Sequence, residues 1–347
     1  MTHRIALLPG DGVGPEVVAV ARLCIDELAL EIEWRELDWG SDHWLRHGSM
    51  MPVDAIEQLR AVDAILMGAV GRPDIPDHVT LWGLILEIRQ RLDLWANVRP
   101  VRLLEGVPCA LAGRVPSDID MLFVRENTEG EYSGVGGRAH RGHPGEVGIE
   151  TAVFTRAGVE RVVEHAFQLA GERRGLLTSA TKSNASRFGY VLWDEVAAEV
   201  AARHPGVHYE HVLVDALAAR MVLRPDSLDV VVASNLFGDI LTDLGAALQG
   251  GMGMAASANL CPGGSAPALF EPVHGSAPDM AGQGIANPCG AVWSGVLMLD
   301  HLGETAAAAR LLAALEDVCR DGPRTRDLGG TATTAEVGAA LRARLTL

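Results

Sequence analysis

The stretch that decides the fold is Val231-Val232-Ala233-Ser234-Asn235-Leu236-Phe237-Gly238-Asp239-Ile240-Leu241-Thr242-Asp243. Its β-branched start predicts a buried strand over residues 230–232, which Gly238 ends, and the Leu-, Ala- and Gly-rich residues that follow predict a helix. Asp239 and Asp243 are the only charges on that helix, and their spacing places them on one face with Cβ atoms roughly 5 to 6 Å apart. Two carboxylates at this distance can hold one hard cation.

The alternative for this pair is a solvated acidic edge, because two like charges at this spacing cost only a few tenths of a kcal/mol on an exposed helix. However, no residue from 244 to 270 is charged, so we expect the helix to be buried. An unpaired ionised carboxylate in such a segment would cost several kcal/mol, and a cation would remove that cost. We therefore favour a metal or substrate site over a structural role.

The composition is that of a globular, acidic protein. With 347 residues, 48% of them hydrophobic, the chain can fill the cores of about two domains. The net charge of −16 repels phosphate, which argues against nucleic acid and anionic membranes as partners. An anionic small-molecule substrate would therefore have to meet a local cluster of arginines.

The cysteines and the N-terminus predict a cytoplasmic, soluble protein. The five cysteines are odd in number and widely spaced without a CxxC pair, which fits a reducing compartment and argues against a disulfide framework or a zinc ribbon. His3 and Arg4 lead directly into a predicted strand, with no apolar signal segment. The uncharged stretch 244–270 is too rich in Gly, Ser, Asn and Pro to cross a bilayer.

Strands and helices alternate along the chain, which predicts an α/β architecture with a largely parallel sheet. Residues 4–8 form the first predicted strand, residues 9–14 a glycine loop, and Pro15 opens a helix where its missing N–H costs nothing. The dinucleotide fingerprint G-x-G-x-x-G fails because Pro15 stands where glycine is required, so we do not expect a Rossmann fold. The loop either brings its backbone to a ligand or only makes a tight turn.

Three arginines are candidate clamps for anionic substrate groups. Arg89 lies on the polar side of a helix predicted over residues 81–92, while Arg99 and Arg125 follow in or after predicted strands. A planar guanidinium matches a carboxylate bidentately. Any one arginine alone is more often part of a surface ion pair, so the prediction depends on the three lying together.

Several polar residues follow the C-terminal ends of predicted strands. They are Arg125, Lys182, Asp215 and the Asp239/Asp243 pair. Ligands of open α/β sheets bind along that edge, so we expect these side chains to serve one site. For Asp215 considered alone, capping the next helix is the simpler interpretation.

Two further segments are predicted to be loops. Residues 134–145 form a glycine-rich loop in which His140 and His143 are expected to be solvated rather than metal-bound. Residues 271–279 and 284–288 offer small residues, one acid and an amide around a turn, which suits adenosine. Asp279 could accept both ribose hydroxyls and would repel a 2′-phosphate.

Long motifs in this chain resemble those of the β-decarboxylating dehydrogenases, the isocitrate/isopropylmalate dehydrogenase family. The motifs span residues 9–16, 234–243 and 270–279, and the resemblance covers nearly the whole chain. Within the family the chain is most similar to tartrate and D-malate dehydrogenases, through segments 81–83, 99–103, 125–132, 180–184 and 231–235. The resemblance implies an isopropylmalate dehydrogenase-like two-domain α/β fold. Residues 1–99 plus 251–347 would bind the cofactor, and residues 100–250 would provide substrate, metal and dimerisation surfaces.

The resemblance also implies roles for individual residues. The substrate carboxylates would be bound by Arg89, Arg99 and Arg125. Asp239 and Asp243 would ligate Mg²⁺ or Mn²⁺ together with Asp215, a catalytic residue contributed by a second copy, so the active unit would be a homodimer with shared sites. Lys182, also from the second copy, would take the hydroxyl proton. Tyr132 would protonate the enol carbon after decarboxylation.

The same resemblance implies a nicotinamide cofactor. Its contacts would be Glu271, His274, Gly275, Ser276, Ala277, Asp279 and Asn287. NADP⁺ users of the family carry a lysine-tyrosine pair where this chain has Asp279-Met280, so we infer NAD⁺. The implied activity is oxidation of a 2-hydroxy dicarboxylic acid, D-malate or tartrate, with β-decarboxylation. D-malate would yield pyruvate, CO₂ and NADH.

The sequence departs from the family pattern where substrate preference is decided. Trp82 stands where isopropylmalate enzymes carry a glutamate, which argues against isopropylmalate. Leu84 replaces a small polar residue of the tartrate/D-malate enzymes, and with Ile85 and Leu86 it predicts an apolar helix face toward the substrate. A 3-isopropylmalate or other 3-alkylmalate dehydrogenase is therefore an alternative, since one methylene is worth only about 1 to 3 kcal/mol of discrimination. An alternative from another class is a catalytically silent regulatory subunit. Such a subunit would be expected to lose some of the residues with implied catalytic or metal-binding roles, but all five are present: Lys182, Tyr132, Asp215, Asp239 and Asp243.

Overall fold

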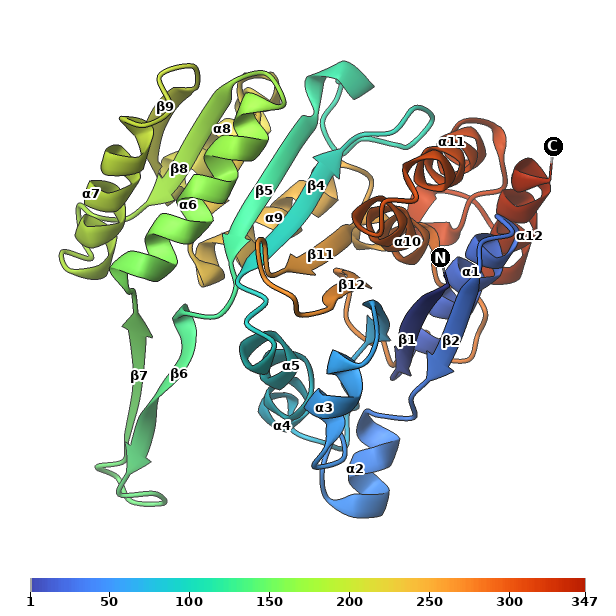
Figure 1. The fold of residues 1–347 in the computed structure, drawn as a ribbon, viewed down its shortest axis with the longest axis horizontal. Helices are drawn as coiled ribbons and strands as arrows, with labels where there is room; N and C mark the ends of the chain where they lie inside the picture. The colour runs from blue at the N-terminus through green and yellow to red at the C-terminus, as the bar shows by residue number, and fades with distance from the viewer. Residues whose placement is uncertain (1, 347) are drawn as a thin grey trace.

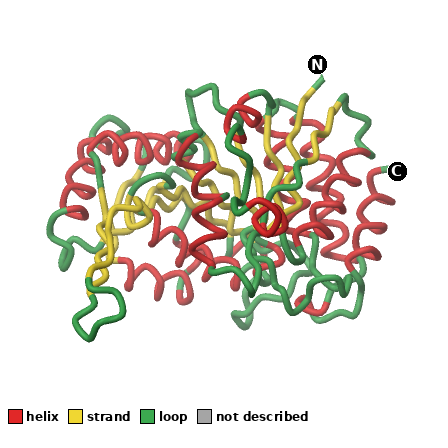
Figure 2. Tube along the Cα trace, turned by 90° about the horizontal axis from the view of Figure 1, so that it is seen from below, coloured by secondary structure: helices red, strands yellow, loops and turns green. Residues whose placement is uncertain are grey.

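The computed structural model describes residues 2–346, and its main feature is a ten-stranded sheet in the order β2-β1-β3-β12-β11-β4-β5-β10-β8-β9 (Figure 1). The antiparallel neighbours in this sheet are β4 with β5, β4 with β11 and β11 with β12, and all other neighbours run parallel. This mostly parallel sheet with helices around it (Figure 2) confirms the predicted α/β class.

The strands occupy short, mostly buried segments. They are β1 His3–Gly10, β2 Ile32–Glu36, β3 Ala64–Ala69, β4 Ala96–Arg102, β5 Asp120–Glu126, β6 Gly130–Ala139, β7 Val147–Val153, β8 Leu176–Thr181, β9 His208–Leu213, β10 Val230–Ala233, β11 Ala256–Leu260 and β12 Ala268–Pro272. The helices are α1 Gly14–Asp26, α2 Ser41–His47, α3 Ala55–Arg60, α4 Asp77–Gly83, α5 Ile85–Arg91, α6 Arg156–Gly171, α7 Gly189–Ala201, α8 Val214–Leu223, α9 Asn235–Leu248, α10 Cys289–His301, α11 Thr305–Asp321 and α12 Thr334–Leu345.

The sheet order brings distant parts of the chain together. Strand β12 pairs in parallel with β3, so a segment near residue 270 lies beside one near residue 65. Strands β5, β10, β8 and β9 follow one another in the other half of the sheet (Figure 1). The site predicted above therefore lies where the antiparallel strands β12, β11 and β4 join these two halves. The division into two domains stays a proposal.

Local capping explains where several helices begin. Pro15 stands in the first turn of α1, as predicted. The Thr155 hydroxyl accepts a hydrogen bond from the backbone N–H of Gly158 at the start of α6, at 3.0 Å. Thr333 and Glu336 form the predicted capping box at α12. No helix within residues 2–346 is long and apolar enough to cross a membrane.

The prediction that Gly238 separates strand β10 from the next helix is wrong. Helix α9 begins at Asn235, directly after Ser234, whose hydroxyl accepts a hydrogen bond from Phe237 N–H. Gly238 therefore lies inside the helix, and the side chain of Arg125 passes close to it. A Cβ atom at residue 238 would lie 2.6 Å from Arg125 Cγ. The glycine therefore makes room for a functional side chain instead of ending a strand.

The single helix predicted over residues 81–92 is wrong as well. The chain forms α4 and α5, with a break at Leu84, whose backbone has φ −133° and ψ −81°. This break turns the Leu84 side chain into a core cluster with Met50 and Ile88, where it is fully buried. Burial of a leucine side chain is worth about 1.5 to 3 kcal/mol, which compensates for the interrupted helix.

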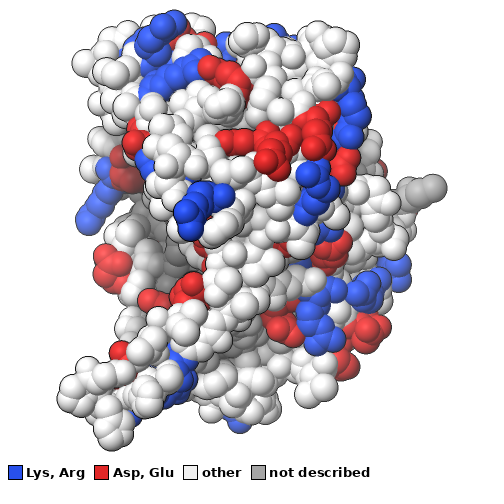
Figure 3. Space-filling model, turned by 90° about the vertical axis from the view of Figure 1, so that its left-hand side faces the viewer, with Lys and Arg blue, Asp and Glu red and all other residues white. Residues whose placement is uncertain are grey.

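The glycine-rich segment predicted as a loop over residues 134–145 belongs to a hairpin arm, in which residues 134–139 lie in strand β6 and residues 140–145 lie in the loop that leads to β7. Strands β6 and β7 pair in antiparallel fashion, with an irregularity between Gly130 and Val135. The arm projects from the body of the molecule in Figures 1 and 3, and it leaves Val135, Val147 and Ile149 exposed. The cross-strand hydrogen bonds of β7 satisfy the backbone, so glycines that favour a loop locally are held in a strand. His140 and His143 are exposed near the tip, as expected.

Candidate active site

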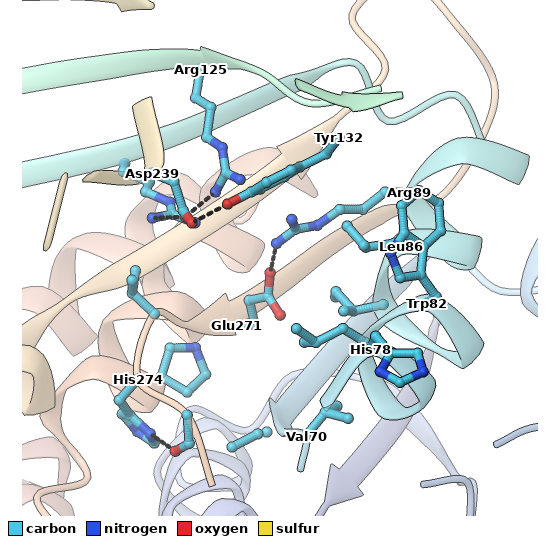
Figure 4. Close-up of a pocket in the computed structure, with 18 residues that line it drawn as sticks. Val70, His78, Trp82, Leu86, Arg89, Arg125, Tyr132, Asp239, Glu271 and His274 are labelled. Carbon is cyan, nitrogen blue, oxygen red and sulfur yellow. Dashed lines mark hydrogen bonds and ion pairs between the residues drawn. The ribbon is translucent and has the colours of Figure 1, made fainter. Parts of the chain in front are cut away.

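A pocket of about 420 Å³ lies where α4, α5, α9, β6 and the antiparallel strands of the sheet meet (Figure 4). It is lined by all three predicted arginines, by Tyr132 and by Asp239. The three arginines come from helix α5 and from the neighbouring strands β4 and β5. The sheet thus assembles the predicted anion clamps around one space.

The centre of the charged side of the pocket is Asp239. Its Oδ1 accepts hydrogen bonds or ion pairs from Arg125 Nη1 at 2.5 Å and Arg99 Nη1 at 3.4 Å. Its Oδ2 accepts a hydrogen bond from the Tyr132 hydroxyl at 3.3 Å. Arg125 is further held by Asn235 Oδ1, which accepts from both Nε and Nη2. These contacts pre-form an arrangement with two guanidinium groups and one phenol around one carboxylate.

The electrostatics of this cluster favour an ionised aspartate. Burial raises the pKa of Asp239, but the positive charges of Arg125, Arg99 and Arg89 outweigh it, so its pKa lies below the ordinary value. Burial and the neighbouring Arg99 lower the pKa of Arg125 to about 9, which leaves that arginine charged at neutral pH. Burial also lowers the pKa of Arg99. With three cations near one aspartate, this side of the pocket suits further negative charge.

Asp239 does not depend on a cation for a partner, since Arg125 and Arg99 already pair with it. Asp243, one turn further along α9, is exposed. The pKa of Asp243 is nevertheless raised, mainly because neighbouring atoms displace part of the water around its carboxylate and secondly because of the negative charge of Asp239. A cation between the two carboxylates would relieve that repulsion. Within residues 2–346, no three His, Cys, Asp or Glu side chains are grouped so as to hold a metal alone.

The third arginine has a different partner. Arg89 Nη2 donates to Glu271 Oε1 at 2.7 Å, and both side chains are buried. The Nε of Arg89 has no hydrogen-bond partner in the part of the chain that the structure describes. A buried donor of this kind favours an incoming acceptor, because an unmade hydrogen bond costs roughly 1 to 3 kcal/mol. Glu271 was predicted to contact the cofactor, and here its carboxylate holds an arginine.

Tyr132 stands beside these charges with its proton retained. Its ring lies under the Arg125 guanidinium, 5.7 Å from ring centroid to Cζ. Burial and then the negative charge of Asp239 raise the pKa of the phenol. A tyrosine that keeps its proton at neutral pH can act as an acid.

Lys182 and Asp215 do not reach the pocket. Lys182 Nζ lies 2.8 Å from Asp215 Oδ1, and the two residues follow β8 and β9 at the outer edge of the sheet. The Asp215 side chain is 66% exposed, and the hydrogen bond from Lys182 lowers its pKa. Asp215 lies in the first turn of α8 without capping it, since the N-cap position is Leu213. The prediction of one common site is therefore only partly met within a single chain.

The apolar wall of the pocket is formed by Trp82, Ile85 and Leu86, as predicted. The expectation that Leu84 shares this face is wrong, because its side chain points into the core. His78 and Leu81 also line the pocket and were missed. They precede Trp82 by four residues and one residue on α4, so a helix drawn back to Asp77 would have placed His78 on the same face.

The predicted cofactor residues lie at and beyond one end of the pocket. Glu271, His274 and Gly275 line it, together with Gly68 and other residues at the end of β3. His274 carries a buried Nε2 that lacks a partner among the described residues, and burial lowers its pKa. Nδ1 faces the Gly275 carbonyl oxygen at 2.9 Å and therefore carries the proton of the neutral ring, so Nε2 can accept one hydrogen bond from a ligand.

The remaining four cofactor residues do not line this pocket. Asp279 is exposed, and Ala277 has a positive φ of 41°. Ser276 accepts a hydrogen bond through its carbonyl from Val13 N–H, which ties the glycine loop to this turn. Asn287 donates to Asp327 Oδ2 at 2.9 Å and accepts from Cys289 N–H. Its amide is thus engaged within the protein.

Comparisons with known proteins agree with this fold. The family model described as isocitrate/isopropylmalate dehydrogenase matches residues 4–341. A probable tartrate dehydrogenase/decarboxylase of Agrobacterium vitis is 52% identical over 341 residues, covering 96% of this chain and 95% of that protein. The decarboxylating D-malate dehydrogenase of Escherichia coli K12 is 49% identical over 352 residues, covering 98% of each chain.

Among solved structures, isocitrate dehydrogenase from Methylococcus capsulatus superimposes with a TM-score of 0.92 at 36% sequence identity, and each chain is covered completely. The protein belongs to the isocitrate/isopropylmalate dehydrogenase family, which confirms the resemblance and the expected fold. The relatives named above are decarboxylating dehydrogenases, and the chain is an enzyme of that class, an oxidative decarboxylase.

Proposed function

We propose that the protein oxidises a 2-hydroxy dicarboxylic acid, D-malate or tartrate, with NAD⁺ and Mg²⁺ or Mn²⁺, and that β-decarboxylation converts D-malate into pyruvate, CO₂ and NADH. The observation that carries this proposal is the pocket in which Arg89, Arg99 and Arg125 surround the ionised Asp239. A dicarboxylate brings two negative charges and suits three guanidinium groups. The names of the related enzymes point to the same substrates.

Asp239 and Asp243 are the residues that would hold the divalent cation. They fit such an ion because their oxygens are hard ligands and because the charge of Asp239 already raises the pKa of Asp243. When bound, the cation supplies positive charge that stabilises the oxygen from which the hydroxyl proton departs and, later, the enolate oxygen. A third protein ligand, Asp215, is proposed to come from a second copy of the chain.

The cofactor would lie at the His274 end of the pocket. The unpaired, buried Nε2 of His274 fits a polar group of the ligand, and Gly275 leaves open space beside it. A nicotinamide cofactor bound there would supply the acceptor for the hydride that leaves C2 of the substrate. Exposed Asp279 would favour a free ribose 2′-hydroxyl over a 2′-phosphate, which supports NAD⁺ over NADP⁺.

The residues of this chain would direct two proton transfers. Lys182 would accept the hydroxyl proton while the C2 hydride leaves, which gives a β-keto acid. The bond between C3 and its carboxylate then breaks, CO₂ departs, and the electron pair remains as an enol. Tyr132, whose phenol keeps its proton next to Asp239, would protonate C3. Arg99 and Arg125 would hold the carboxylate that stays.

We further propose a homodimer in which each pocket receives Lys182 and Asp215 from the other copy. These residues lie outside their own pocket, beside α8 and α9. Exposed apolar side chains on these helices, Leu223 and Ile240, and on the β6–β7 arm support a self-complementary surface. On the face in Figure 3, acidic and basic side chains are interspersed without a basic patch. The net charge of −16 supports our proposal that neither nucleic acid nor a membrane is a partner. A cytoplasmic location stays a prediction.

A 3-alkylmalate remains the second candidate substrate because the wall near Arg89 includes Leu81, Ile85 and Leu86. Trp82, which is 38% exposed, lines the same wall and stands where isopropylmalate enzymes carry a glutamate, which supports the leading substrates. Leu84 no longer supports this alternative, since it lies in the core. A silent regulatory subunit is disfavoured by the pre-formed cluster around Asp239.

The deciding experiment measures NADH formation by the purified protein with Mn²⁺ on D-malate, the tartrates, 3-isopropylmalate and isocitrate, each repeated with a chelator. We expect a chelator-sensitive rate that is highest on D-malate or tartrate. A higher kcat/KM on 3-isopropylmalate would replace the leading substrate by the alternative. An absence of turnover on every substrate, with the protein folded, would favour the silent subunit.

A further inference from the structure

Two fully buried asparagines connect the arginines on opposite walls of the pocket. Asn97 on β4 accepts a hydrogen bond from Arg99 Nε through Oδ1 at 2.6 Å. Its Nδ2 donates to Asn259 Oδ1 on the adjacent strand β11 at 2.8 Å. Asn259 Nδ2 in turn donates to Glu271 Oε1 on β12 at 3.0 Å, and this same oxygen accepts from Arg89. The chain of contacts runs across three neighbouring strands.

The direction of every hydrogen bond in this chain is determined by its ends. A guanidinium can only donate, and a carboxylate can only accept. Asn97 must therefore turn its oxygen to Arg99 and its nitrogen to Asn259, and Asn259 must turn its nitrogen to Glu271. Flipping either amide would place two acceptors or two donors against each other. Only one arrangement of the two amides satisfies both ends.

We propose that Asn97 and Asn259 are positioning residues that hold Arg99 and Arg89 at a set separation for the two carboxylates of the substrate. The inference rests on the proposed function, in which these arginines bind the substrate. Neither asparagine lines the pocket, so each acts through the arginine or the glutamate that it contacts. The hydrogen bonds thus couple Arg99 on β4 to Arg89 on α5 without a direct contact between the two arginines.

The surrounding contacts anchor this chain firmly. Asn97 Nδ2 also donates to Ser257 Oγ at 2.7 Å, and Asn259 Nδ2 also donates to the Leu269 carbonyl at 3.1 Å. On the far side, Arg99 Nη1 donates to Thr242 Oγ1 at 2.6 Å. Burying amides is costly unless their hydrogen bonds are made, and here both amides use their oxygen and their nitrogen. Displacement of either one would leave an arginine with a lost or misplaced partner.

The protein also offers a residue for a matched control variant. Asn127 is buried and donates to the same Asn259 Oδ1 at 3.0 Å and to the Leu94 carbonyl at 2.8 Å. It touches neither an arginine nor Glu271. Asn127→Ala therefore removes a buried amide from the same neighbourhood without breaking the connection between Arg99 and Arg89.

The test compares Asn97→Ala, Asn97→Asp, Asn259→Ala and Asn127→Ala in the complete enzyme, using melting temperature and the KM values for substrate and NAD⁺. We expect Asn97→Ala and Asn259→Ala to raise the substrate KM about tenfold, the scale of one hydrogen bond to a charged group, with the KM for NAD⁺ within about twofold. Asn97→Asp keeps the oxygen that holds Arg99 Nε, so it should recover part of the substrate KM. Asn127→Ala should lower the melting temperature comparably and leave the substrate KM within about twofold.

The proposal would be overturned if Asn127→Ala changed the substrate KM as much as Asn97→Ala and Asn259→Ala do. It would also be overturned if Asn97→Ala and Asn259→Ala lowered the melting temperature without changing the substrate KM. If an alanine variant does not fold, Asn97→Asp decides by itself. It severs the link to Asn259, where two acceptors would then meet, so an unchanged substrate KM contradicts the coupling. The wild-type substrate panel is measured first. If the wild type turns over neither D-malate nor tartrate, the proposed function is contradicted. The variants are then compared by calorimetry, which measures binding of the dicarboxylate that the wild type does oxidise. If it oxidises none, D-malate is used.

Discussion

The Asp239 cluster and the Lys182–Asp215 pair are both built from opposite charges, yet their surroundings differ. Asp239 meets Arg99, which is 4% exposed, and Arg125, which is 2% exposed. Lys182 and Asp215 meet each other at the outer edge of the sheet, where their side chains are 29% and 66% exposed. Because water screens the second pair, it contributes little to stability, whereas the first cluster is held rigidly by its neighbours.

This difference indicates which half of the site a single chain can complete. The buried cluster already has the charge and the hydrogen bonds that a dicarboxylate requires. The exposed pair has groups able to move a proton and to bind a metal, but nothing in its own chain brings them to the pocket. The comparison thus supports a site completed by a second copy, and three experiments can sharpen or break it.

The largest effect is expected for Asp239→Asn. The substitution leaves Arg99 and Arg125 without their carboxylate and removes a proposed metal ligand, so we expect kcat/KM to fall by about 100-fold or more, the scale of losing one well-placed electrostatic group. The apparent affinity for Mn²⁺, measured by titration of activity, should weaken in parallel. Activity close to wild type would show that the buried cluster serves only folding.

Co-expression of Lys182→Ala with Asp239→Asn tests whether sites are shared. Each homodimer should be nearly inactive, while a mixed dimer should contain one pocket with an intact Asp239 and an intact Lys182 from the other copy. At equal expression about a quarter of all sites should be active, as random pairing of two-fold dimers requires. Activity of the mixture no higher than that of the separate variants, with mixed dimers isolated by two affinity tags, would place both residues in the same chain's site.

The smallest effect is expected for Asp243→Asn in the absence of metal. The pKa of Asp243 is raised in the folded protein, so its ionised form is disfavoured there. With chelator present at pH 7, the variant should melt about 1 °C higher, the size expected for removing one like-charge contact. The gain should shrink as pH falls through the folded pKa and vanish below the ordinary carboxyl value of about 4, where the Asp243 carboxyl is protonated in both the folded and the unfolded state.

Addition of Mn²⁺ gives the control for that measurement. It should raise the melting temperature of the wild type more than that of Asp243→Asn, because binding to the folded state alone stabilises it. An Asp243→Asn variant that melts lower than the wild type in chelator would contradict the like-charge interpretation.

Most elements and most of the pocket could be predicted from local patterns. The four-residue spacing of Asp239 and Asp243, the capping box at Thr333 and the β-branched run of β10 depend only on neighbouring residues. The predicted pocket residues are confirmed as neighbours where parallel and antiparallel strands bring them to one place, as for Arg99 and Arg125.

The errors concern residues whose position depends on distant partners. Gly238 is a glycine that makes room for Arg125 within a helix, and Leu84 interrupts a helix because a core that includes Met50 accepts its side chain. The β6–β7 arm is extended because the two strands satisfy each other's backbone. None of these partners lies within the local window that sets periodicity and turn preference.

The sequence by itself determined the family, the α/β class and the chemical groups of the site, because motifs and strand-helix periodicity are local properties of the chain. Only the tertiary structure decided that Arg89 faces Glu271 while Arg99 and Arg125 face Asp239, and that Lys182 and Asp215 stay outside their own pocket. Charge pairing depends on distance and burial, and both are set by the packing of segments more than a hundred residues apart, as for Arg125 and Asp239.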